Sequence, residues 1–157
     1  MSADLDWRHP SEPVEALMTA LERAAIGLLG AAECEDRTLS IVIVDDAQMR
    51  QLNHDWRDVD DTTDVLSFPL DEGEGLVGVG PLGDVVISLD VASEQATTHG
   101  LSTLQELLYL LTHAFCHLRG HDHHAPTEAA EMAAEEARLL AVIAPDMTRP
   151  SSYYPAT

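Results

Sequence analysis

The sequence predicts one α+β domain, in which a small mixed β-sheet of three to four strands packs with about five helices and a zinc site lies at the end of a central helix. Short β-branched apolar runs alternate with longer segments of helical periodicity along the 157 residues. The segment L-L-Y-L-L at residues 107–111 is apolar on nearly all sides, which predicts a helix buried at the centre of the fold. No repeat or linker divides the chain, so residues 1–157 are expected to form a single domain, with residues 145–157 as a loose tail containing three prolines.

The expected strands are apolar runs bounded by polar residues or proline. Residues 38–44 read T-L-S-I-V-I-V, a run that predicts a strand buried on both faces. An edge strand is one interpretation of residues 1–12, and the glycine-rich residues 71–81 are expected to form a flexible surface loop. The main strands are therefore expected at residues 38–44, 64–70 and 83–89.

The expected helices begin at recognisable capping residues. Asp45 and Asp46 precede the second helix, Asp90 precedes the third, and Ser102 with Gln105 resembles a capping box at the start of the fourth. The last helix carries several carboxylates that are expected to form a solvated face: Glu128, Glu131, Glu135 and Glu136. The five helices are expected at residues 13–29, 47–56, 90–99, 102–118 and 126–143.

The charge balance restricts the partners of the chain. There are 28 acidic residues against 8 basic ones, all arginine, which gives a net charge of −20. This argues against broad electrostatic capture of nucleic acid, so a polyanion would have to be held by a few arginines and a metal. The sequence shows no membrane span and no signal peptide, and its two cysteines, Cys34 and Cys116, are isolated. A cytoplasmic protein without a membrane partner is expected, with Cys116 as a small buried hydrophobe rather than a ligand.

A histidine-rich stretch is the strongest chemical signal. Five of the eight histidines fall within residues 112–124. His113 and His117 are four residues apart, a spacing that places both side chains on one face of a helix. Two neutral imidazoles held in this way form half of a tetrahedral zinc site.

The third ligand is expected to follow the end of this helix. Gly120 occupies a position where helices commonly end in a left-handed residue, which would let the chain turn back and offer His123. If the helix continued instead, His121 would be the third histidine of the row. Because positions i and i+8 lie about 12 Å apart along a helix axis, a straight row cannot share one ion. His123 is therefore the expected ligand, with His121 or His124 beside the site or facing solvent, although a histidine-rich tract can also bind metal adventitiously.

Three histidines leave one coordination position of zinc for water, which is typical of a catalytic site. Zinc lowers the pKa of bound water to about 7 and polarises phosphoryl oxygens, and a site without acidic ligands suits an anionic substrate such as a phosphodiester. A zincin protease would carry a glutamate general base after the first histidine. Ala114 occupies that position, so peptide hydrolysis by this mechanism is not expected.

Two further residues are candidates for catalysis. Arg57, in the polar stretch between a helix and a strand, is expected to balance charge on the phosphoryl oxygens, in preference to Arg119, which adjoins the negative end of its helix. A surface ion pair is the alternative interpretation of Arg57. Asp122 would orient a histidine or accept a proton, or would serve only as a turn residue.

Five segments of the chain together carry a resemblance to one known family. They are H-A-F-C-H-L-R-G-H-D-H, L-N-H-D-W-R, T-D-V-L-S-F-P, L-G-D-V-V-I-S and the E-A-A-E-M of the last helix. They resemble the YbeY-type metal-dependent endoribonucleases of bacterial rRNA maturation, in which the first segment has the pattern H-G-x-L-H-L-x-G-Y-D-H. The chain departs from the pattern at Ala114 and His121, which replace Gly and Tyr, and at D-D-T in residues 60–62, which replaces D-K-P. The last change removes a lysine and weakens the local positive field.

The resemblance implies a single α+β domain with one zinc ion on His113, His117 and His123, and an essential arginine at Arg57. It implies cleavage of single-stranded RNA at the 3′ end of small-subunit rRNA and a part in ribosome quality control, with the ribosome or its proteins as partners and no DNA substrate. A ribosome- or partner-binding factor with a structural metal and little catalysis is the alternative, motivated by the net charge of −20. A hydrolase of smaller phosphorylated or amide substrates would share the same metal chemistry.

Overall fold

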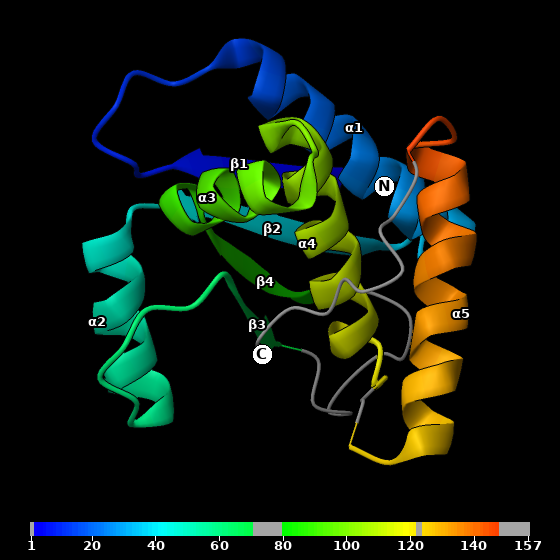
Figure 1. Cartoon of the computed structure of the whole chain (residues 1–157). Coiled ribbons are helices and arrows are strands. Elements are labelled where there is room, and N and C mark those ends of the chain that lie inside the picture. The colour runs from blue at the N-terminus through cyan, green and yellow to red at the C-terminus, as the bar shows by residue number, and fades with distance from the viewer. Residues whose placement is uncertain (1, 71–79, 122–123, 148–157) are drawn as a thin grey trace.

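The structure, a computed structural model, describes residues 2–70, 80–121 and 124–147. Five helices and four strands lie in this part of the chain (Figure 1). The strands are β1 (Ser2–Trp7), β2 (Arg37–Val44), β3 (Val65–Pro69) and β4 (Gly80–Ser88). The helices are α1 (Glu15–Ala31), α2 (Asp46–Arg57), α3 (Leu89–His99), α4 (Thr103–Leu118) and α5 (Pro126–Ile143). The predicted α+β class, the mixed sheet and the order of the elements are confirmed.

The four strands form one sheet in the order β1-β2-β4-β3. β1, β2 and β4 are parallel, and β3 pairs antiparallel with β4, so that β1 and β3 are the two edges. In β2 the residues of one face are fully buried, whereas those of the other face are mostly half-buried. The prediction that residues 38–44 are buried on both faces was therefore wrong in degree, because a single short helix covers the second face.

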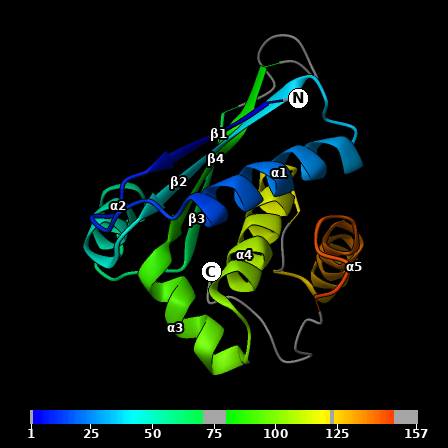
Figure 2. The same ribbon diagram turned by 90° about the horizontal axis from the view of Figure 1, so that it is seen from above.

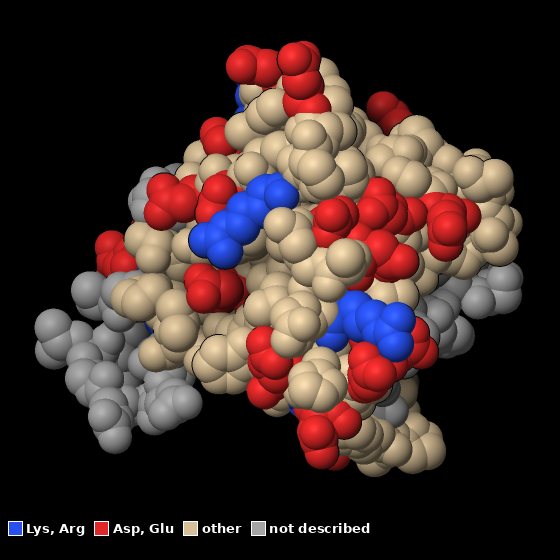
Figure 3. Space-filling view, turned by 90° about the vertical axis from the view of Figure 1, so that its left-hand side faces the viewer, with Lys and Arg blue, Asp and Glu red and all other residues tan. Residues whose placement is uncertain are grey.

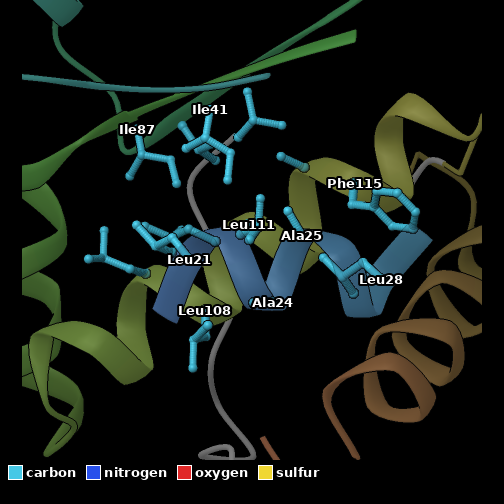
Figure 4. Packing of buried hydrophobic residues seen from close by; sticks show 14 of the residues in the cluster. Leu21, Ala24, Ala25, Leu28, Ile41, Ile87, Leu108, Leu111 and Phe115 are labelled. Carbon is cyan, nitrogen blue, oxygen red and sulfur yellow. The ribbon is translucent and has the colours of Figure 1, made fainter. Parts of the chain in front are cut away.

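The larger core lies between the sheet and the helices α1 and α4, with α3 and α5 beside them (Figure 2). Leucines and alanines of α1 meet the apolar face of α4, and Ile41 and Ile87 project from the sheet toward both helices (Figure 4). On the other face of the sheet, Met49 of α2 packs with Leu66 and Val86. The side chains of neighbouring residues in each strand point to opposite faces, which explains the two clusters.

The central helix is α4, as predicted. It begins at Ser102, whose hydroxyl accepts a hydrogen bond from the backbone of Gln105, while the Gln105 side chain accepts one from the backbone of Ser102. Every residue from 106 to 116 is buried. The helix ends at Leu118, and Gly120 follows with φ of +92°, a left-handed conformation that residues with a Cβ adopt at a cost. This confirms the expected break between His117 and His121.

Some local predictions need correction. The cap of α3 is Ser88, whose hydroxyl accepts from the Val91 backbone, and not Asp90, which lies in the first turn. Arg57 is the last residue of α2 rather than part of the following loop. Residues 71–79 of the predicted glycine-rich loop and residues 148–157 of the predicted tail lie outside the described residues, while Met147 packs against the core. None of the helices in the described ranges combines the length and apolar composition that a membrane crossing requires.

Candidate metal centre

The last turns of α4 bring His113 and His117 together. Their Nε2 atoms lie 3.2 Å apart, and the two rings meet at 85° with centroids separated by 4.7 Å. His113 is only 4% exposed. The predicted spacing therefore produces a real pair, with one nitrogen of each ring directed at a common point.

The other nitrogen of each ring is anchored by an oxygen acceptor. Nδ1 of His113 donates a hydrogen bond of 2.5 Å to the Glu136 carboxylate, and Nδ1 of His117 donates one of 3.0 Å to the backbone oxygen of His121. These acceptors select the tautomer with the proton on Nδ1. Both Nε2 lone pairs then face each other, an arrangement that requires a proton or a metal ion between them.

The geometry fits zinc. Two zinc–nitrogen bonds of about 2.05 Å at a tetrahedral angle place their nitrogens ~3.3 Å apart, close to the 3.2 Å found. A metal-bound histidine commonly donates its second N–H to a carboxylate or a carbonyl, as both rings do here. His113 and His117 are therefore suited to hold the ion, although no cluster of three metal-ligating side chains occurs among the described residues. His123 and Asp122 lie outside those residues, so the three-histidine site remains a prediction.

Glu136 was misassigned from the sequence. It is 3% exposed and points into the molecule, and it does not belong to a solvated face. Its second oxygen accepts a hydrogen bond of 3.4 Å from the Tyr109 hydroxyl, and the Tyr109 ring stacks near His113 with centroids 6.2 Å apart. The signal was present in the sequence, because Met132, Glu136 and Leu139 follow the i, i+4, i+7 period of the buried face of α5.

A second carboxylate of α5, Glu135, forms ion pairs with two arginines. It accepts hydrogen bonds of 2.7 Å from Arg119 Nη1 and from Arg138 Nε, and Arg138 also bonds the backbone oxygen of Ala31. The hydrogen bonds from Arg138 and then Arg119 lower the pKa of Glu135 to about 2. The interaction links the end of α4 to α5 and α1 and occupies Arg119, which was the rejected candidate for a catalytic cation.

Cys116 adjoins His117 in sequence but takes no part in the pair. It is fully buried, and burial raises the pKa of its thiol to about 12. The expectation that Cys116 is a small buried hydrophobe is confirmed.

Arg57 stands at the exposed C-terminal end of α2, before Asp58 in a left-handed conformation with φ of +57°. Within the described ranges the Arg57 guanidinium makes no ion pair. The alternative interpretation from the sequence was that Arg57 forms a surface ion pair. The structure brings the two histidines together, while Arg57 lies on a different helix.

Comparisons with known proteins identify the family. The family model described as Endoribonuclease YbeY matches residues 7–144. An Endoribonuclease YbeY of Syntrophotalea carbinolica is 45% identical over 127 residues, covering 78% of this chain and 84% of the relative. One of Myxococcus xanthus is 46% identical over 125 residues, covering 79% of this chain, and one of Anaeromyxobacter dehalogenans is 45% identical over 119 residues, covering 76%. The chain spans only 42% and 61% of the length of these last two relatives.

The fold has a counterpart among experimental structures. The solution structure of TM1509 from Thermotoga maritima matches with a TM-score of 0.63 at 20% sequence identity, covering 95% of this chain and 99% of that protein. At this identity the likeness concerns the fold alone. Together with the family match over residues 7–144 and the relatives above 40% identity, it leads to one conclusion: the chain belongs to the Endoribonuclease YbeY family.

Proposed function

We propose that this chain is a zinc-dependent endoribonuclease that cleaves single-stranded RNA, acting on the 3′ end of small-subunit rRNA and in ribosome quality control. The proposal extends to a cytoplasmic location and to contact with the ribosome. The observation that carries it is the pair of Nε2 atoms 3.2 Å apart, each on a ring whose Nδ1 is anchored. The names of the relatives, all called Endoribonuclease YbeY, support the choice of RNA as substrate.

The residues have distinct roles in this proposal. His113 and His117, with His123 as the third donor, hold the ion, which when bound supplies Lewis acidity toward a phosphoryl oxygen and an acidified water. Glu136 holds the ring of His113 and keeps its proton on Nδ1. Arg57 binds a phosphate oxygen and offsets the negative charge that grows during phosphodiester cleavage, and Asp122 orients a histidine or accepts a proton.

The test uses purified, metal-loaded protein and a single-stranded fragment of the rRNA 3′ end. His113→Ala and Arg57→Ala should each abolish most cleavage, while Arg23→Ala, which removes an exposed arginine of α1, should leave it unchanged. Metal analysis should find one zinc per wild-type chain and a loss of zinc in His113→Ala but not in Arg57→Ala. Cleavage that survives both His113→Ala and Arg57→Ala would come from a contaminating nuclease and would refute the proposal.

The alternative function is a ribosome- or partner-binding factor in which the metal is structural. The net charge of −20 favours it, because a strongly acidic protein attracts basic ribosomal proteins more readily than RNA. In that case removal of zinc would lower the melting temperature, and the zinc-loaded protein would bind its partner without cutting RNA. Cleavage that depends on both His113 and Arg57 excludes this alternative.

A further inference from the structure

The last turn of α2 carries an aromatic side chain that the metal centre does not use. Trp56 is 69% exposed, although a tryptophan is usually well buried. Its ring meets that of Phe68 in β3 at 66°, with centroids 5.9 Å apart, so the indole is supported from one side. Exposed apolar side chains follow at the end of each element, Val59 after α2 and Leu70 after β3. A single exposed hydrophobe needs no explanation, but an aromatic one braced by a second ring beside Arg57 forms a surface suited to a ligand.

This aromatic surface lies at the same end of the edge strand β3 as the histidine pair. A Cβ placed on Gly83 would lie 2.6 Å from Leu118 Cδ2 and 2.6 Å from the backbone oxygen of Phe68. The end of α4, one residue after His117, is therefore packed against the end of β3. The Phe68 side chain belongs to the smaller cluster on the α2 face of the sheet, so Trp56 and the histidines flank this edge strand from opposite faces.

The charge of the molecule restricts how RNA could be held there. Arginines are few and lie among acidic side chains on the face that carries α2 (Figure 3). Several arginines are already paired with carboxylates: Arg8, Arg50, Arg119 and Arg138. With a net charge of −20 and few phosphate-binding groups, affinity from counterion release is small. Stacking of a base on an aromatic ring needs no net charge and contributes about 1–3 kcal/mol per base.

We propose that Trp56, braced by Phe68, is a base-stacking subsite for single-stranded RNA that passes round the edge strand β3 to the histidine pair. The proposal rests on the proposed endoribonuclease function and names the contact that gives it a preference for single strands. Bases in a duplex are stacked on their neighbours and are not available to the indole, whereas bases of a single strand are. Because the subsite and the histidines lie on different faces, only a substrate of several nucleotides reaches both.

The first test compares two substrates, a single-stranded 12-mer and a dinucleotide. Trp56→Leu, which keeps an apolar side chain without a π-face, should raise KM for the 12-mer about 5- to 150-fold at nearly unchanged kcat. It should leave kcat/KM for the dinucleotide unchanged, and Trp56→Tyr should restore most of the affinity for the 12-mer. Val142→Ala, at an exposed apolar site on α5, is the matched control and should change neither KM for the 12-mer nor kcat/KM for the dinucleotide. An unchanged KM for the 12-mer in Trp56→Leu, or an equal loss on both substrates, would overturn the proposal.

The second test measures binding without cleavage. The chain has two tryptophans, so the double variant Trp7→Phe, His113→Ala leaves Trp56 as the only indole and removes a proposed metal ligand. The 12-mer should quench its fluorescence, and the corresponding duplex should not. If the wild type cuts neither substrate but the 12-mer still quenches Trp56, the stacking subsite is supported and the nuclease function fails. If the wild type cuts the 12-mer and no quenching occurs, the nuclease function stands and the stacking subsite is refuted.

Discussion

Substitution of Glu136 by glutamine tests whether the buried carboxylate prepares His113 for a metal. Glutamine has nearly the same shape and retains an oxygen that can accept the hydrogen bond from His113 Nδ1, now 2.5 Å long. The negative charge is lost, and with it the increase in basicity that a carboxylate gives to the opposite ring nitrogen. We expect Glu136→Gln to fold and to keep the histidine pair.

The size of the effect follows from the burial of the pair. His113 is 4% exposed and Glu136 is 3% exposed, so solvent screens their interaction only weakly. Partners of this kind typically change metal affinity by about 10- to 100-fold, or about 1.4–2.7 kcal/mol. Glu136→Ala should do more, because it leaves the donors of His113 and Tyr109 without this acceptor and opens a cavity. We expect it to lower the free energy of unfolding by about 2–4 kcal/mol.

The assay is competition for zinc between the protein and a chromophoric chelator at neutral pH, with melting temperatures measured on the same samples. Glu131→Gln is the matched control, because it removes an equal charge from an exposed position of α5. We expect the wild type and Glu131→Gln to bind zinc with equal affinity, and Glu136→Gln to bind it more weakly. Equal affinities for all three proteins would refute the reasoning that the Glu136 carboxylate tunes the site.

Three further predictions concern the surroundings of the pair. Gly120→Ala should lower stability by about 1–2 kcal/mol from backbone strain, since φ is +92° and no atom of the residues that the structure describes lies within 4 Å of a new Cβ, and chemical denaturation would measure the loss. Gly83→Ala should lower stability by about 1–3 kcal/mol, measured by chemical denaturation, because its Cβ would lie 2.6 Å from the backbone oxygen of Phe68 and would push β3 away from β4. The interaction of Glu135 with Arg138 should contribute about 1 kcal/mol after solvent screening. The folded pKa of about 2 lies below the ordinary 4.5, so this contribution is present above about pH 4.5 and is lost as pH falls toward 2. Unfolding of wild type and Glu135→Gln across that range should show their difference in stability shrink as pH falls, and a constant difference would contradict the assignment.

Capping residues predicted the starts of the helices that carry the site, because a cap acts within one turn of the chain. The reciprocal hydrogen bonds of Ser102 and Gln105 start α4 where expected, and Pro126 opens α5. The position of Glu136 depends on tertiary packing, since the charge of a glutamate predicts exposure while its place in the apolar period predicts burial. Glu136 is buried, as its place in the apolar period predicts, because His113 and Tyr109 of α4 donate hydrogen bonds to its carboxylate. The sequence alone could not pair either residue with Glu136.

The helix break at Gly120 was predicted from the sequence, but its effect on the orientation of His117 was not. A helix that continued would point the carbonyl of residue 121 along the helix axis, away from the preceding turn. The left-handed residue instead returns the chain, and the backbone oxygen of His121 comes within 3.0 Å of His117 Nδ1. His121 therefore acts on the pair through its backbone and not as the next imidazole of a helical row. The same turn orients His117 just as Glu136 of α5 orients His113, so each ring of the pair is held by a residue that follows α4 in the chain.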